Sequence, residues 1–206
     1  MTVLERLLEA KIVAIFRGDY GGNWLAYAEA LRDNGVLVME ITLNSPGALA
    51  GIRQLMSTMG DSVLVGAGTV LTPDAVDAAA DAGATFIVAP DTDEGVIAAT
   101  LNRGLVPIPG AYTATEIKRA FNYGAPLVKL FPATAPEYIK AIRAPLNHIP
   151  LMATGGVDVS NAADFLRAGA SALGVGGSLL SPALRPDQVG QRAADLIDAI
   201  QGRQRA

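Results

Sequence analysis

Short apolar runs alternate with longer segments of helical periodicity from one end of the chain to the other. An apolar run bounded by glycine or proline is typical of a buried strand, whereas apolar residues at every third or fourth position indicate a helix packed on a core. The pattern predicts eight strands, at residues 12–16, 37–43, 63–70, 85–89, 105–109, 125–132, 151–154 and 172–175. It predicts helices at residues 2–10, 23–34, 46–59, 73–82, 92–102, 113–122, 136–143, 160–168 and 186–200.

Residues that favour helix ends stand at several of these boundaries. Thr72 and Pro73 predict an N-cap followed by a first helical residue, and Ser45 and Pro46 predict the same arrangement after the second strand. Gly35 indicates where the helix before the second strand ends. The boundaries therefore support a regular alternation of strand and helix.

The strand–helix unit recurs at intervals of roughly 20–26 residues, which predicts a (β/α)₈ TIM barrel with an extra N-terminal helix. A doubly wound open sheet is the alternative, but the turn at residues 17–20 lacks the glycine-rich sequence of that fold. Gly66-Ala67-Gly68 also lacks the third glycine of a dinucleotide-binding motif. We expect residues 1–206 to form a single domain that ends in a polar, frayed tail at residues 201–206.

Composition excludes several classes of protein. Hydrophobic residues make up 50% of the 206 residues, the net charge is −4, and no run of lysine and arginine occurs, so we expect neither disorder nor a nucleic-acid partner. The absence of cysteine excludes disulfide and thiol chemistry. The one histidine, His148, stands in a predicted loop, and we expect no metal site and no cofactor. The first ten residues are typical of neither a signal peptide nor a membrane span, so we expect a cytoplasmic protein without a membrane partner.

Polar residues interrupt four of the apolar strands near the ends at which such barrels carry their chemistry. These residues are Arg17, Glu40, Thr69 and Lys129. Because side chains alternate between the two faces of a strand, each of them is compatible with pointing into the barrel mouth. The same alternation predicts that Val65 and Ala67 share the face of Thr69. We therefore expect a site to which four strands contribute.

Lys129 and Glu40 are the informative pair. Burial lowers the pKa of a lysine, as a Schiff-base lysine requires, and it raises the pKa of a carboxyl toward the range in which it exchanges protons near neutral pH. The alternatives are a Lys129 ammonium that reaches water and a structural ion pair between Glu40 and Lys129 or Arg17. One amine and one proton carrier are the groups that Schiff-base chemistry needs, and it needs no metal.

Two glycine pairs follow the last two predicted strands. Gly155 and Gly156 follow the seventh strand, and Gly176 and Gly177, with Ser178, follow the eighth. Glycine allows backbone N–H groups to approach an anion, and the loops after strands 7 and 8 are the common phosphate site of this fold. Two tight turns are the alternative explanation, but the paired positions favour a phosphate site.

Six short motifs occur in a fixed order across almost the whole barrel, at residues 40–46, 66–71, 107–110, 128–133, 154–156 and 176–178. Each motif alone is weak, but the ordered set resembles the 2-keto-3-deoxy-6-phosphogluconate/6-phosphogalactonate (KDPG/KDPGal) aldolase family. The resemblance implies a class I aldolase, a metal-independent carbon–carbon lyase. It would cleave a phosphorylated keto sugar acid to pyruvate and D-glyceraldehyde 3-phosphate and assemble as a homotrimer.

The resemblance also implies roles for individual residues. Lys129 would form the Schiff base, and Glu40 would carry protons. Substrate-binding residues would be Arg17, Asn44, Thr69, Pro90, Phe131 and Thr154, and phosphate-binding residues would be Gly155, Gly156, Gly176, Gly177 and Ser178.

Asn44 separates the two branches of the family. The phosphogluconate branch carries an arginine at this position for the substrate carboxylate, whereas the phosphogalactonate branch resembles this chain in having asparagine there and an arginine where Arg17 stands. Arg17 would supply the missing cation, since a guanidinium binds a carboxylate through two hydrogen bonds. We therefore expect KDPGal as the substrate, with KDPG or both substrates as the alternative. A phosphate-binding isomerase or epimerase and a non-catalytic metabolite sensor are more distant alternatives.

Overall fold

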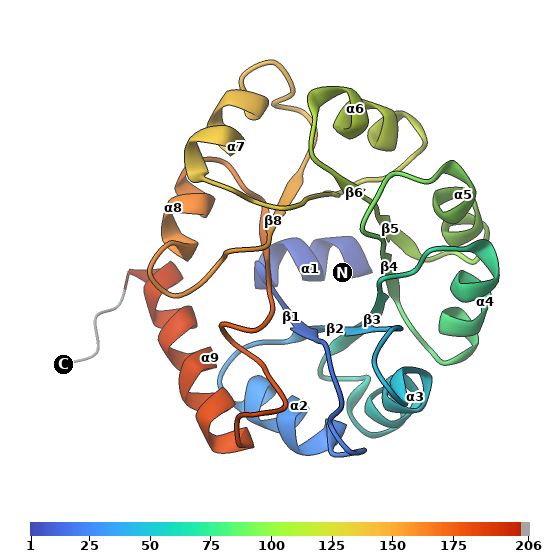
Figure 1. The fold of residues 1–206 in the computed structure, drawn as a ribbon, viewed down its shortest axis with the longest axis vertical. Coiled ribbons are helices and arrows are strands. Elements are labelled where there is room, and N and C mark those ends of the chain that lie inside the picture. The colour runs from blue at the N-terminus through green and yellow to red at the C-terminus, as the bar shows by residue number, and fades with distance from the viewer. Residues whose placement is uncertain (203–206) are drawn as a thin grey trace.

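A ring of parallel strands forms the centre of the molecule, and helices surround it (Figure 1). The computed structural model describes residues 1–202. The strands are β1 (Ile12–Phe16), β2 (Val38–Thr42), β3 (Leu64–Gly68), β4 (Phe86–Val88), β5 (Val106–Ile108), β6 (Gly110–Ala111), β7 (Val128–Leu130), β8 (Leu151–Thr154) and β9 (Ala172–Val175). Their hydrogen-bonded order is β5-β4-β3-β2-β1-β9-β8-β7-β6, and the neighbouring strands are parallel.

Pro109 divides the fifth predicted strand into two short pieces. β5 precedes Pro109 and hydrogen-bonds to β4, whereas β6 follows it and hydrogen-bonds to β7. Proline has no N–H to donate to a sheet, so the strand changes partners at this residue. Because β5 and β6 stand at the two ends of the strand order, their covalent link closes the ring. The eight predicted strands therefore build the (β/α)₈ barrel that the sequence predicts.

The predicted N-terminal helix is α1 (Val3–Ala10), which crosses one end of the barrel at the centre of the view in Figure 1. The outer helices are α2 (Trp24–Asp33), α3 (Ala48–Met59), α4 (Pro73–Asp81), α5 (Glu94–Asn102), α6 (Ala114–Asn122), α7 (Pro136–Arg143), α8 (Ala162–Arg167) and α9 (Pro186–Gln201). None of the helices within residues 1–202 has the length and apolar character needed to cross a membrane.

Two layers of apolar side chains stabilise the barrel. Inside the ring, Leu7 of α1 packs against inward-facing strand residues that include Val13, Phe86 and Met152. A larger cluster lies between the strands and the outer helices and includes Phe16. Since α1 and the inner cluster fill one end of the ring, a site inside the barrel has room only at the opposite end, where the strands finish.

One of the two predicted N-caps is wrong. Thr72 caps α4 as expected, because its hydroxyl accepts a hydrogen bond from a backbone N–H of the first turn at 3.2 Å. Ser45 does not cap α3, which begins only at Ala48. The preceding residue, Gly47, has a φ of +74°, so the chain has not yet entered the helical conformation at Pro46. The buried Ser45 hydroxyl makes its hydrogen bonds elsewhere, next to Arg17.

The polar tail differs from the prediction at its first residue. Gln201 is the last residue of α9, and Gly202 follows it in the left-handed conformation that ends many helices. Residues 203–206, on which the rest of that prediction falls, lie outside the described residues.

Candidate active site

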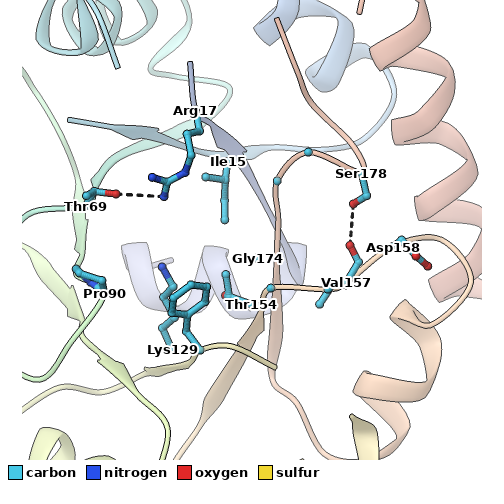
Figure 2. Close-up of a pocket in the computed structure, with 15 residues that line it drawn as sticks. Ile15, Arg17, Thr69, Pro90, Lys129, Thr154, Val157, Asp158, Gly174 and Ser178 are labelled. Carbon is cyan, nitrogen blue, oxygen red and sulfur yellow. Dashed lines mark hydrogen bonds between the residues drawn. The ribbon is translucent and has the colours of Figure 1, made fainter. Parts of the chain in front are cut away.

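A cavity of about 500 Å³ opens at the end of the barrel opposite α1. Figure 2 shows the side chains that line it, which come from strands on all sides of the ring. The predicted site residues that line this cavity are Arg17, Thr69, Pro90, Lys129, Phe131, Thr154, Gly155, Gly156, Gly176, Gly177 and Ser178. Glu40 and Asn44 do not line the cavity: the Glu40 carboxyl lies next to Gly68, and Asn44 hydrogen-bonds to Arg17.

Lys129 lies in the middle of β7 and projects into the cavity (Figure 2). Its backbone pairs with Gly110 of β6 and Met152 of β8, so the strand register fixes its position. The residue is 4% exposed, and its ammonium nitrogen lies 4.9 Å from the centre of the Phe131 ring. Burial lowers the pKa of the Lys129 amine, the Glu40 carboxylate works against this shift, and the Arg17 cation adds to it. A larger fraction of the amine is therefore neutral and nucleophilic than for a lysine in water.

Glu40 lies in β2 with no exposed surface. Burial raises the pKa of the Glu40 carboxyl, and the Lys129 and Arg17 cations oppose this shift. Within residues 1–202 neither of its carboxylate oxygens has a hydrogen-bond partner. A buried carboxyl without partners retains its lone pairs for a proton or a water molecule, which suits a group that exchanges protons.

Gly68 makes room for the Glu40 carboxyl. A Cβ atom built on Gly68 would lie only 1.7 Å from Oε1 of Glu40 and 2.6 Å from its Cγ. β2 and β3 are neighbouring strands, so the carboxyl of Glu40 on β2 occupies the space that a side chain at Gly68 on β3 would fill. The sequence marks Gly68 as part of a motif, but only the structure shows what occupies the space beside it.

Arg17 reaches over the cavity from the end of β1. Its guanidinium donates to the side-chain oxygen of Asn44 at 3.3 Å and to the hydroxyl of Thr69 at 3.2 Å, the second of which appears in Figure 2. Asn44 therefore orients Arg17 and does not itself border the cavity. A guanidinium has five N–H donors, so these two hydrogen bonds leave others available, and Arg17 lines the cavity together with Ile15.

Thr69 reaches the cavity by a route that strand alternation does not predict. Val65 and Ala67 pack in the outer cluster and not on the inward face, so the expectation that they share a face with Thr69 is wrong. β3 ends at Gly68, and Thr69 has a φ of +55°, which breaks the alternation and turns its side chain toward Arg17. A β-branched residue in this conformation is strained, and its hydrogen bond with Arg17 contributes to holding it there.

The glycine loops after β8 and β9 form one wall of the cavity. The Ser178 hydroxyl donates to the carbonyl of Val157 at 2.7 Å and ties the two loops together, as Figure 2 shows. Arg192 of α9 donates to the Ser178 carbonyl at 2.9 Å from the outside. The glycine pairs of both loops and Ser178 line the cavity. Successive backbone N–H groups in such loops are suited to binding an anion.

Thr154 stands at the end of β8, between Lys129 and this wall. Its hydroxyl is buried and has no hydrogen-bond partner among the described residues. Gly174 leaves room for it, because a Cβ at that position would overlap the hydroxyl. Four further residues line the cavity without having been predicted as site residues, namely Ile15, Val157, Asp158 and Gly174. Apolar, glycine and loop residues like these occur throughout the sequence, so residue type does not single them out. No group of three histidine, cysteine, aspartate or glutamate side chains suited to a metal ion occurs in residues 1–202.

The model of the KDPG and KHG aldolase family matches residues 3–192. This chain belongs to that family. The match runs from α1 into α9 and therefore includes every strand of the barrel that surrounds the cavity.

Individual relatives agree with this assignment. The chain is 38% identical to a 2-dehydro-3-deoxy-6-phosphogalactonate aldolase of Escherichia coli over 91% of this chain and 93% of that protein. It is 36% identical to a probable aldolase of the same kind from Rhizobium meliloti, over 96% of each chain. It is also 33% identical to a 2-dehydro-3-deoxy-phosphogluconate aldolase of Treponema pallidum, over 89% of this chain and 88% of that protein.

A solved structure of native KDPGal has the same fold. It superposes with a TM-score of 0.90 at 37% identity and covers 93% of this chain and 94% of that chain. The family, the relatives and the fold therefore agree, and both phosphogalactonate and phosphogluconate aldolases occur among the relatives.

Proposed function

We propose that this chain is a class I aldolase that cleaves 2-dehydro-3-deoxy-6-phosphogalactonate to pyruvate and D-glyceraldehyde 3-phosphate without a metal ion. The observation that carries the proposal is a buried amine, Lys129, that faces the cavity beside a buried carboxyl, Glu40, whose oxygens are unpartnered. The lowered pKa of Lys129 favours the neutral nucleophile, and the raised pKa of Glu40 favours exchange of protons near neutral pH.

In the proposed reaction the neutral Lys129 amine attacks the C2 ketone, and loss of water from the carbinolamine gives an iminium ion. Glu40 removes the proton of the C4 hydroxyl, and the C3–C4 bond breaks as its electron pair moves into the iminium. Glyceraldehyde 3-phosphate leaves, and C3 of the remaining enamine takes up a proton. Water then hydrolyses the iminium, which releases pyruvate and restores the amine. Because Glu40 does not line the cavity, we assign its proton exchange to a path through one water molecule.

The proposed substrate orientation follows the charges of the cavity. Arg17, held by Asn44 and Thr69, binds the carboxylate next to C2. Pro90 and Phe131 border the pyruvate half of the substrate, and Thr154 offers its free hydroxyl between the two halves. The phosphate binds the backbone of Gly155, Gly156, Gly176, Gly177 and Ser178.

Two features support the phosphogalactonate over the phosphogluconate substrate. The position that carries an arginine in the phosphogluconate branch is Asn44 here, and Arg17 supplies the cation. The relative from Escherichia coli at 38% identity is described as a phosphogalactonate aldolase, and the relative from Rhizobium meliloti is described as a probable one. Phosphogluconate cleavage is the second candidate, which the relative from Treponema pallidum supports.

The test is a cleavage assay with both phosphosugar acids, read through lactate dehydrogenase as pyruvate release. We expect a higher kcat/KM for the galactonate epimer and no turnover by Lys129→Met, whose thermal unfolding should show an intact fold. A higher kcat/KM for the gluconate epimer would reverse the substrate assignment, and turnover by Lys129→Met would refute the mechanism. We further propose a cytoplasmic homotrimer, on the strength of the family resemblance, to be tested by light scattering of the purified protein.

A further inference from the structure

Two buried hydroxyl groups hydrogen-bond to the backbone of the residues on either side of Arg17. Thr42 is the last residue of β2 and has no exposed surface, and Ser45 follows three residues later and is 4% exposed. Their hydroxyl oxygens lie 2.9 Å apart. Neither residue lines the cavity, and Ser45 is free of the capping role that its sequence context predicts.

The direction of the hydrogen bonds in this pair is fixed by its neighbours. The N–H of Gly18 donates to the Ser45 hydroxyl at 3.0 Å, and the Thr42 hydroxyl donates to the carbonyl of Phe16 at 3.1 Å. Each hydroxyl has one hydrogen, and that of Thr42 is used on Phe16, so Ser45 donates to Thr42. The chain of bonds therefore runs from Gly18 through Ser45 and Thr42 to Phe16, and each hydroxyl donates once and accepts once.

This chain of hydrogen bonds begins and ends on the two residues that flank Arg17. The turn that follows β2 also holds the guanidinium itself, because the side-chain oxygen of Asn44 accepts a hydrogen bond from it at 3.3 Å. Gly18 is confined from the other side as well, because its φ is +120° and a Cβ there would lie 2.8 Å from the Pro182 ring. Both the backbone and the side chain of Arg17 are therefore fixed before a ligand enters the cavity.

We propose that Thr42 and Ser45 are positioning residues for Arg17 and set the affinity of the cavity for the carboxylate of a 2-keto acid. This inference rests on the proposed function, in which Arg17 binds that carboxylate. A long arginine side chain loses conformational freedom when it binds an anion, and an anchored backbone reduces that loss. The hydroxyl pair acts on the substrate only through Arg17, and it does not touch the reacting atoms.

The experiment uses pyruvate as the probe, because pyruvate carries the carboxylate and the ketone but no phosphate. Borohydride reduction at increasing pyruvate concentration, with mass analysis of the adduct on Lys129, gives a half-saturating concentration. We expect Ser45→Ala and Thr42→Val to raise this concentration about tenfold, since each leaves a buried polar group unpaired next to Arg17. This value depends on concentration and not on the amount of folded protein, so it remains measurable in a less stable variant.

Two variants serve as matched controls. Thr42→Ser keeps the hydroxyl and should restore the half-saturating concentration to within about twofold of the unmodified protein. Thr100→Val removes a hydroxyl that is equally buried but donates to the carbonyl of Val96 within α5. It should leave the half-saturating pyruvate concentration unchanged. In an Arg17→Ala background, Ser45→Ala should add less than about twofold, because the group that it positions is gone.

Three results would overturn the inference, and they differ in what else they affect. Pyruvate affinity in Ser45→Ala and Thr42→Val equal to that of the unmodified protein would refute the inference and leave the proposed function standing. The full effect of Ser45→Ala in the Arg17→Ala background would show that the pair does not act through Arg17. No adduct in the unmodified, folded protein would refute the proposed function and the inference together.

Discussion

Gly68→Ala tests whether the position of the Glu40 carboxyl matters for turnover. The added methyl group would lie 1.7 Å from Oε1 of Glu40, and Cβ atoms are essentially never found closer than 3.0 Å to another atom. The carboxyl therefore has to withdraw by about 1.3 Å, the difference between these distances. A displacement on the order of 1 Å in a reacting group lowers rates by roughly 10²-fold. We expect the rate of proton transfer by the enzyme, and with it kcat, to fall by about that factor.

The assay for Gly68→Ala is the exchange of the pyruvate methyl protons with deuterium from the solvent, followed by NMR. This exchange needs the imine on Lys129 and the proton carrier, but no phosphorylated substrate. Gly66→Ala is the matched control, because the three atoms nearest to a Cβ there all belong to the ring of Phe86 in the inner core. We expect it to lower the melting temperature and to change the exchange rate of the folded protein little. Equal exchange rates in Gly68→Ala and the unmodified protein would refute the placement of Glu40 as the proton carrier.

Three further predictions concern Glu40 and the helix cap of α4. Glu40→Gln removes the proton carrier and should slow turnover by roughly 10²–10⁴-fold, and a loss of less than tenfold in the coupled assay would argue that water alone suffices. The same variant should be more stable than the unmodified protein at neutral pH. Folding raises the pKa of Glu40 above 4.5, so the unmodified protein loses stability as the pH rises from that value toward the folded pKa. Glutamine does not titrate, so the variant does not lose this stability. The difference in melting temperature between the variant and the unmodified protein should therefore be larger at about pH 7 than at about pH 4. An equal difference at both pH values would contradict the predicted direction of the pKa shift. Thr72→Ala should cost about 1 kcal/mol of unfolding free energy through the lost cap, whereas Thr72→Ser should cost little in denaturant titrations.

The barrel was predictable from the sequence because its signals are local. Each strand is a short apolar run, and each helix has a periodic apolar face, so the order of elements follows from the pattern alone. Thr72 shows that a cap is also readable when a proline follows it at the first helical position. Ser45 is also followed by a proline and yet does not cap a helix. Gly47 delays the start of α3, and the Ser45 hydroxyl hydrogen-bonds to Gly18 and Thr42 instead.

Most of the residues that line the cavity were predictable from the sequence, but the geometry of the cavity was not. Lys129 and Glu40 were found because a charge inside an apolar strand is costly without a function. Thr69 was assigned to the cavity from strand alternation, but it reaches Arg17 through a positive φ that no residue pattern indicates. The space beside Gly68 and the hydrogen bonds of Ser45 depend on neighbours distant in the sequence, so only the folded chain reveals them.

Borohydride reduction in the presence of pyruvate, followed by peptide mass analysis, tests the Schiff base most directly. The chain has three other lysines, Lys11, Lys118 and Lys140, and all three are exposed, whereas Lys129 is buried and lines the cavity. The account predicts one stable pyruvyl adduct, located on Lys129. An adduct on an exposed lysine only, or no adduct in folded protein, would contradict it.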